Sequence, residues 1–264
     1  MRVLLLAALA FCLAMPSAAQ VTRAEAEALL RLNGFDYAMD YTEELLRRPR
    51  WEDFDDAPIW ERSASGLFSA TEMFDTTADT ISGEMAREHY ETLVAFFESD
   101  AGLAVTSAEI ASQLPGQDED MQEQAGARLL QEMDAERRAS LRRMREGFET
   151  GFTRYVSLQI GMTVALADFA RQGETDVNPN RLLAILAENF EAQRPEREAS
   201  SLAESAWTYR EVSDEALAAY ADLLNAPAGT AFYTLMDRGM VEALQDDFLL
   251  HRRLFVGAAG ARDI

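Results

Sequence analysis

The chain has 264 residues, 48% of them hydrophobic and 27% charged, which is enough to bury one large core or two smaller ones. Its 46 acidic and 24 basic residues give a net charge of −22, and every basic residue is an arginine. Such an acidic chain repels nucleic acids and anionic membrane surfaces, so we expect neither as a partner.

The first 19 residues have the pattern of a secretory signal peptide. A positive charge at Arg2 is followed by an apolar core at 3–15 and by small residues at 16–19. The core of about 13 residues is shorter than the ~20 that cross a bilayer. We therefore expect cleavage after Ala19, a mature chain without a membrane span, and a periplasmic or secreted location in a Gram-negative bacterium. The single cysteine, Cys12, lies in this segment, so we expect no thiol chemistry in the mature chain.

The region 20–113 is predicted to be a series of helices. The sequence TRAE at 22–25 is a capping box, and it starts a helix that should end near Gly34. A second helix is predicted over 37–47. After an acidic loop, Pro58 suits the first turn of a further helix, which the apolar spacing extends into the seventies.

Two similar stretches organise the expected fold. Residues 89–105 and 216–232 each have an apolar helix face, a short break, an Ala-Gly pair and a second apolar run. Gly102 and Gly229 stand at equivalent positions, and we expect each to take a positive φ that ends one helix and lets the next begin. The alternative is a chance similarity between two amphipathic helices.

The break sequences resemble a known motif. They are FFESDAG at 96–102 and LLNAPAG at 223–229. Both resemble the Phe-Tyr-x-Ser-Pro-x-Gly motif of an uncharacterised family of exported bacterial helical proteins, which is known as a domain of unknown function. The first copy has Asp100 where the motif has proline, and the second keeps Pro227 but lacks the aromatic pair. The resemblance implies an exported helical domain and supplies no catalytic residue.

The rest of the chain is expected to complete an all-α fold. A polar linker is predicted over 114–126, a C-terminal helical region with the second copy over 127–256, and a flexible tail over 257–264. The stretch 155–169 alternates like a strand, but small residues recur every four positions and its neighbours are helical, so we expect a buried central helix. We expect one compact multi-helix bundle, built around two helix-break-helix modules that central helices join.

The sequence offers few groups for chemistry. His89 and His251 have no ligand partner three or four residues away, so we expect structural roles, with His251 complementing a helix dipole near a helix end. Two acidic clusters could attract calcium: Asp53, Asp55 and Asp56, and Asp118, Glu119 and Asp120. Both lack the ligand spacing and the glycine of an EF-hand, which favours solvated loops.

The arginines of 136–146 form the one basic concentration. They could hold a phosphate or an acidic partner. We expect instead that Arg138, Arg142 and Arg145 flank the apolar stripe that begins at Leu141 and pair with nearby acids. Large apolar residues are dense in the first third, and they either line an apolar groove or form core: Trp51, Phe54, Trp60, Phe68, Met73, Phe74 and Met85.

No catalytic or ligand-binding residue, metal or cofactor can be assigned from the sequence. The leading hypothesis is a non-catalytic protein-interaction module with an unidentified protein partner or with self-association. The first alternative is a carrier of an apolar ligand or lipid in the bacterial envelope. The second is a hydrolase with acidic catalytic residues.

Overall fold

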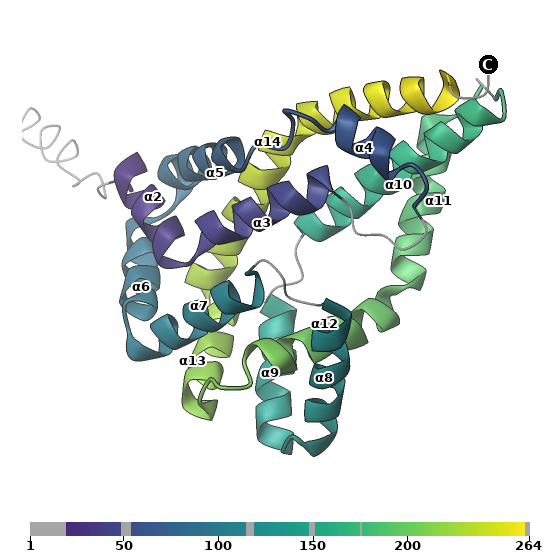
Figure 1. Cartoon of the computed structure of the whole chain (residues 1–264). Helices are drawn as coiled ribbons and strands as arrows, with labels where there is room; N and C mark the ends of the chain where they lie inside the picture. Colours follow the sequence, from purple (N-terminus) through teal and green to yellow (C-terminus); the bar gives the residue numbers. More distant parts are fainter. Residues whose placement is uncertain (1–19, 49–53, 115–118, 148–150, 175, 262–264) are drawn as a thin grey trace, which may run out of the picture.

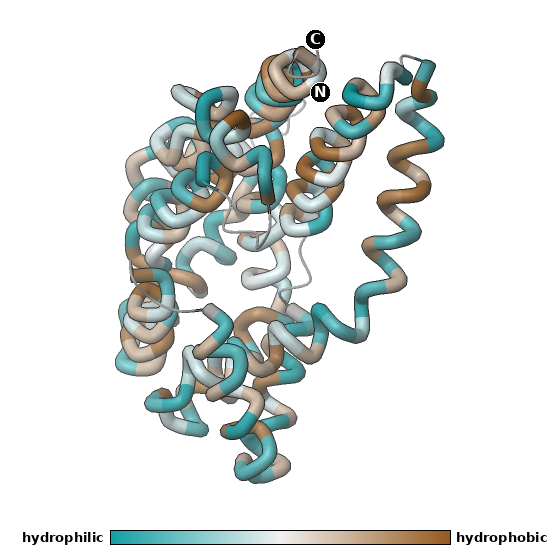
Figure 2. The backbone as a smooth tube through the Cα atoms, turned by 45° about the vertical axis from the view of Figure 1, so that its right-hand side comes forward, coloured by the Kyte–Doolittle hydropathy of each residue, from teal (hydrophilic) through white to brown (hydrophobic). Residues whose placement is uncertain are grey.

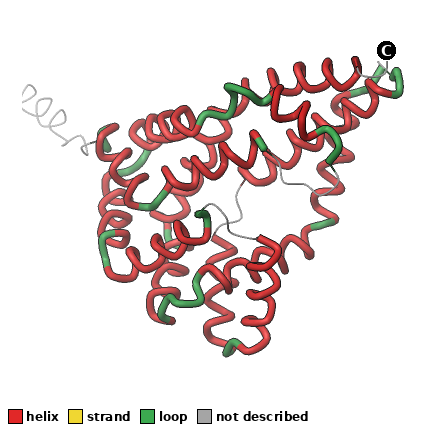
Figure 3. The backbone as a smooth tube through the Cα atoms, viewed as in Figure 1, coloured by secondary structure: helices red, strands yellow, loops and turns green. Residues whose placement is uncertain are grey.

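The computed structural model describes residues 20–48, 54–114, 119–147, 151–174 and 176–261. These ranges contain thirteen helices and no strand (Figures 1 and 3), which confirms the all-α multi-helix prediction. The expected signal segment lies outside the described residues. No helix of the described ranges is long and apolar enough to cross a membrane.

Of the four N-terminal helices, the first and the last begin at a side-chain cap. They are α2 (Arg23–Leu32), α3 (Phe35–Arg47), α4 (Ala57–Ser63) and α5 (Ala70–Glu84). The capping box is confirmed, since the Thr22 hydroxyl accepts from the Glu25 amide at 3.3 Å and the Glu25 carboxylate accepts from the Thr22 amide at 2.8 Å. Gly34 takes a φ of +81° between α2 and α3.

The prediction of one helix from Pro58 into the seventies is wrong. The chain leaves the helix after Ser63, and Gly66 takes a φ of +79°. A new helix begins at Ser69, whose hydroxyl accepts from the Glu72 amide. Apolar periodicity continues across the break because both helices face the same core, so spacing alone did not reveal it.

Both copies of the repeated motif form a helix, a break and a second helix. The first unit is α6 (Arg87–Phe97) with α7 (Asp100–Ser112), and the second is α13 (Asp214–Asn225) with α14 (Pro227–Gly260). The second helices are N-capped at Ser99 and Ala226, which are 127 residues apart (226 − 99). Gly102 and Gly229 have the same separation (229 − 102).

The expected role of the two glycines is wrong. Neither has a positive φ, and each lies in the first turn of the second helix. A Cβ atom on Gly102 would lie 2.2 Å from the carbonyl oxygen of Phe96, and one on Gly229 would lie 2.1 Å from that of Leu223. Glycine is required because the new helix passes directly over the last turn of the old one, not because the backbone turns there.

The two units exchange partners, because α6 packs on α14 and α7 packs on α13. At three positions of the repeated motif the residues of both units are fully buried: Leu93 and its equivalent Tyr220, Phe97 and its equivalent Leu224, and Val105 and its equivalent Phe232. The Phe96 ring also stacks on Tyr220 with centroids 5.7 Å apart. This shared interior, together with α5 against α14, forms the main core.

The remaining helices complete the body and form a projecting arm. They are α8 (Glu119–Glu132), α9 (Ala135–Gly147), α10 (Gly151–Arg171), α11 (Pro179–Ala192) and α12 (Arg194–Thr208). The predicted linker over 114–126 is wrong from Glu119 onward, because α8 packs closely on α12. A Cβ atom on Gly126 would lie 1.9 Å from the carbonyl oxygen of Ala203. The predicted fraying after Val256 is also wrong, since α14 continues to Gly260.

The stretch 155–169 is helical, as expected, but it is not a buried central helix. Within α10 only Met162, Thr163 and Ala167 are buried. One side of α10 packs on α14 and another on α11, where a Cβ atom on Gly161 would lie 3.2 Å from the Leu186 side chain. Figure 2 shows α11 standing apart from the body, with apolar residues along it.

Candidate functional site

The two histidines have structural surroundings. His89 is partly exposed on α6. His251 is completely buried in the middle of α14, so its expected position near a helix end is wrong. Its ring lies 4.2 Å from the Trp60 ring and 5.8 Å from the Phe255 ring, measured between centroids. Burial lowers the pKa of His251 to about 4, so the imidazole is neutral at pH 7.

The acidic clusters form no metal centre in the part of the chain that can be described, where no group of three ligating side chains occurs. Asp55 and Asp120 are exposed, and Asp56 pairs with Arg171 of α10. The remaining members fall outside the described positions: Asp53, Asp118 and the side chain of Glu119.

The basic segment flanks buried apolar residues, as expected, but its predicted pairing with acids is confirmed for Arg145 and not for Arg138. Leu141 and Met144 of α9 are buried. Arg138 donates to the backbone carbonyls of Leu130 and Met133, and Arg145 lies 3.5 Å from Glu198. Arg142 is exposed.

The large apolar residues of the first third are core instead of a groove lining. Five of them are buried: Trp60, Phe68, Met73, Phe74 and Met85. Phe54 is partly buried and stacks near Phe255, with centroids 6.3 Å apart. Trp51 lies outside the described residues.

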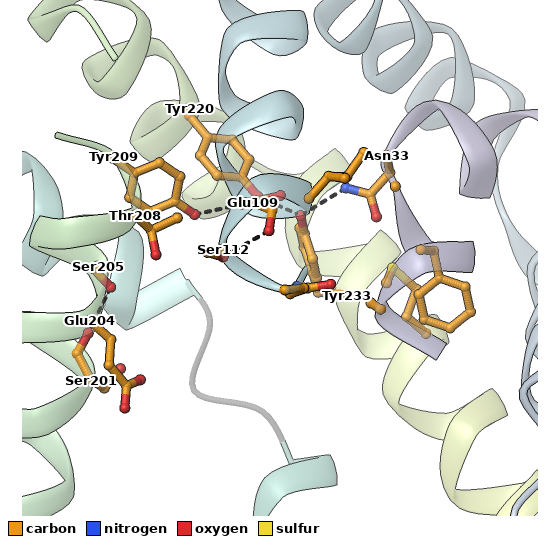
Figure 4. A pocket seen from close by; sticks show the side chains of 16 residues that line it. Asn33, Glu109, Ser112, Ser201, Glu204, Ser205, Thr208, Tyr209, Tyr220 and Tyr233 are labelled. Atoms are coloured by element: carbon orange, nitrogen blue, oxygen red, sulfur yellow. Dashed lines mark hydrogen bonds between the residues drawn. The ribbon is translucent and has the colours of Figure 1, made fainter. Parts of the chain in front are cut away.

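A pocket that the sequence did not indicate lies where the turn between α2 and α3, the start of α3, and α7, α12, α13 and α14 meet. Its volume is about 310 Å³, and Figure 4 shows its lining. Its centre is the carboxyl group of Glu109, in the last turns of α7. Tyr209 follows the end of α12, while Tyr220 and Tyr233 come from α13 and α14. We call this space the Glu109 pocket.

Local sequence brings these elements together. Asn33 is the C-cap residue of α2, and the positive φ of Gly34 turns the chain so that this corner packs on α7. A Cβ atom on Gly34 would lie 3.1 Å from Ile110 and 3.2 Å from Thr106, both on α7. Because α7 also packs on α13, the Glu109 side chain faces the tyrosines.

A directional chain of hydrogen bonds ends on Glu109. The Tyr209 hydroxyl donates to Glu109 Oε1 at 2.5 Å, and the Tyr220 hydroxyl donates to the same oxygen at 3.0 Å. Because Tyr220 uses its proton there, it accepts from the Tyr233 hydroxyl, 2.8 Å away. Tyr233 in turn accepts from Asn33 Nδ2 at 3.5 Å. Two donors thus reach Oε1 directly, and Tyr233 and Asn33 continue the chain behind Tyr220.

The second oxygen of the carboxyl group faces the pocket. No donor among the described residues reaches Oε2, and this atom is not one of the buried side-chain atoms that lack a partner. Glu109 is correspondingly only partly buried as a residue, although protein surrounds the rest of its carboxyl group. A ligand in the pocket can therefore reach Oε2 without displacing a protein partner.

Burial changes the acidity of the whole cluster. Desolvation raises the pKa of Glu109 to about 7, although the hydrogen bonds from Tyr209 and Tyr220 act in the opposite direction. Desolvation, with the charge of Glu109 as a further cause, also raises the pKa values of Tyr209, Tyr220 and Tyr233. The tyrosines are therefore neutral at pH 7, and Glu109 exchanges its proton near that pH.

Sequence reasoning missed Glu109 because it is one of 46 acidic residues. A usable signal did exist. Gly102, Val105 and Thr106 are buried on one face of α7, and Glu109 continues that face at the i+3, i+4 spacing. Its counterpart in the second unit is Met236, 127 residues later (236 − 109), which is also buried. An acid at a core-facing position of a repeated helix is the pattern to look for.

Comparisons with models of protein families, with curated proteins and with solved structures returned no match.

Proposed function

We propose that the protein is a non-catalytic binding protein of the bacterial envelope that holds a small polar ligand in the Glu109 pocket. The observation that carries this proposal is a carboxyl group with a strongly raised pKa, fixed by tyrosines on one oxygen and open to a pocket on the other. The signal-like segment supports the proposed location in the periplasm or outside the cell.

The lining favours a ligand with hydrogen-bond donors. Besides Glu109, it includes the carboxylate of Glu204 and the side-chain carbonyl of Gln113, and no arginine or histidine stands among its described residues. The Gln113 oxygen is buried without a hydrogen-bond partner among the described residues. An ammonium or amide group would satisfy such acceptors. This polarity supports a polar ligand over the apolar ligand or lipid of the carrier hypothesis.

The hydrolase hypothesis has less support. The described donors to the Glu109 carboxyl are two tyrosines, and burial keeps both of them neutral. A neutral tyrosine hydroxyl is a weak nucleophile. A glycosidase needs two carboxyl groups that flank the bond to be broken, whereas the Glu204 carboxyl group points away from Glu109 in Figure 4. The arrangement fits binding and orientation of a ligand better than bond cleavage.

Native mass spectrometry of the protein purified without detergent from its own host tests the proposal. We expect extra mass that leaves on denaturation, and we expect the Glu109→Gln variant to lose it. The matched control is Glu242→Gln, an exposed residue on α14, which should keep it. A wild-type protein without bound mass, or equal retention by both variants, would contradict the proposal.

A second candidate function is protein interaction, through self-association or an unidentified partner. It is favoured by exposed apolar side chains on α11, where Leu183 and Ile185 are 41% and 46% exposed. Light scattering on wild type and Ile185→Arg tests self-association, with Leu103→Arg on α7 as an equally exposed control. A monomer at all concentrations would count against self-association through this helix.

A further inference from the structure

A second pocket of about 620 Å³ adjoins the Glu109 pocket. Four arginines from α9, α10 and α12 line it: Arg145, Arg154, Arg194 and Arg197. We call it the arginine pocket. Among the described residues of its lining three are glutamates, so basic residues outnumber acidic ones in that set, whereas the whole chain has 24 basic and 46 acidic residues. This local reversal of charge sets the arginine pocket apart from the general surface.

The arginines are fixed in position by protein groups. Arg197 lies over the Phe190 ring, 3.5 Å from its centroid, and donates to the Phe190 backbone carbonyl. A ring and a carbonyl therefore hold it, in place of a carboxylate. Glu191 is shared, at 2.6 Å from Arg194 and 3.6 Å from Arg154. Because a ring and a carbonyl hold Arg197, its guanidinium group keeps hydrogen-bond donors for a carboxylate or phosphate group.

One face of α12 connects the two pockets. Ser201 and Glu204 line both. The polar residues of this face follow the three- and four-residue spacing of a single helix stripe: Arg194, Arg197, Ser201, Glu204 and Thr208. Figure 4 shows the part from Ser201 to Thr208, with Tyr209 at the end nearest Glu109. At 1.5 Å per residue, Arg197 and Thr208 are about 16 Å apart along the helix axis.

We infer that the two pockets are the ends of one groove for a linear zwitterion, with its anionic group at Arg197 and its ammonium group at Glu109. This inference rests on the proposed function, since it extends the ligand of the Glu109 pocket along α12. The two ends have opposite charge, and the stripe between them carries a hydroxyl and a carboxylate that face both pockets. A molecule with a charge at one end only would pair with Arg197 or with Glu109, but not with both.

Pentaglycine with free termini is a suitable probe, because five extended residues span roughly 16 Å. Its N-acetylated and C-amidated forms each remove one terminal charge. Amide chemical shifts of the full chain, measured by two-dimensional NMR during titration to millimolar concentrations, report where each probe binds. We expect pentaglycine to move amides of α12 at both ends of the stripe.

Two variants separate the ends. Arg197→Gln should weaken pentaglycine binding about tenfold and leave the C-amidated form unaffected, since loss of a hydrogen bond between charged groups has that size. Glu109→Gln should weaken pentaglycine similarly and leave the N-acetylated form unaffected. Arg143→Gln on the exposed face of α9 is the control and should change nothing.

The outcomes distinguish this inference from the proposed function. Shifts confined to the Glu109 pocket, with no effect of Arg197→Gln, would overturn the groove and leave the proposed function in place. If both variants weakened the binding of all three probe forms equally, whichever terminal charge had been removed, the groove would also be overturned. If pentaglycine did not bind but the protein still carried a co-purified ligand, the inference of a zwitterionic ligand would be overturned. The proposed function of the Glu109 pocket would then stand. No shifts and no co-purified ligand would overturn both.

Discussion

Replacing Glu109 with glutamine should make the protein more stable at alkaline pH. Glutamine has nearly the same shape as protonated glutamic acid and still accepts from Tyr209 and Tyr220 at Oε1. In the wild type, burial raises the pKa of Glu109 from 4.5 to about 7. The folded state therefore binds this proton more tightly than the unfolded state, and the contribution to stability is fully present below pH 4.5 and is lost as the pH rises through 7.

The magnitude follows from the pKa change. One pKa unit corresponds to 1.36 kcal/mol, so complete burial of the carboxyl group would lower the free energy of unfolding by about 3 kcal/mol between pH 4.5 and 8. Because Glu109 is partly exposed to the pocket, we expect about 2 to 3 kcal/mol. Glu109→Gln should match the wild type below pH 4.5, differ from it only slightly at pH 5, and exceed its stability by this amount at pH 8.

Urea unfolding at a series of pH values from 5 to 8 measures the difference between the two proteins, so groups common to both cancel. Glu242→Gln, an exposed substitution on α14, should change stability by less than about 0.5 kcal/mol at every pH. A difference between wild type and Glu109→Gln that stays flat from pH 5 to 8 would refute the reasoning. It would mean that the carboxyl group is solvated and that the tyrosine cluster does not enclose it.

Three further predictions concern other residues. Because the pKa of His251 is about 4 in the folded protein, the wild type should lose about 3 kcal/mol of its free energy of unfolding as the pH falls from 6.5 to 4. His251→Leu should abolish this loss, and acid titration followed by circular dichroism checks it. Gly229→Ala should lower the free energy of unfolding by about 3 kcal/mol or prevent folding, since its Cβ would lie 2.1 Å from the Leu223 carbonyl oxygen. At Gly257 an added Cβ meets no atom within 4 Å, so Gly257→Ala should be neutral or slightly stabilising. Thermal unfolding compares the two variants. Tyr220→Phe removes a donor to the Glu109 carboxyl, so it should cost about 1 kcal/mol and raise the Glu109 pKa further, which an NMR titration of the side-chain carboxyl carbon would detect.

Much of the fold was accessible from the sequence because helix starts are local. The Thr22 capping box depends on side chains and amides within three residues, and it was identified correctly. The error at Gly102 shows the limit of this approach. A glycine preferred for its backbone angle and a glycine preferred for close approach look the same in one sequence, and only the contact with Phe96 distinguishes them.

The site was not accessible because it depends on long-range packing. Glu109 meets Tyr209 and Tyr220 across about a hundred residues of chain, and Asn33 meets Tyr233 across 200. Nothing in the immediate neighbourhood of Glu109 distinguishes it from an exposed glutamate except its place on the buried face of α7. The raised pKa of Glu109 follows from burial by elements that lie far apart in the chain, which local patterns do not encode.

The exchange of partners between the two units also sets the order in which the chain can fold. The apolar faces of α6 and α7 are covered by α13 and α14, so they stay open until residues 214–260 are available. Contacts between such distant segments require a large loop to close first, which slows folding. We expect an N-terminal fragment that ends before α13 to expose Leu93 and Phe97 and to aggregate, whereas the full chain folds as one cooperative unit.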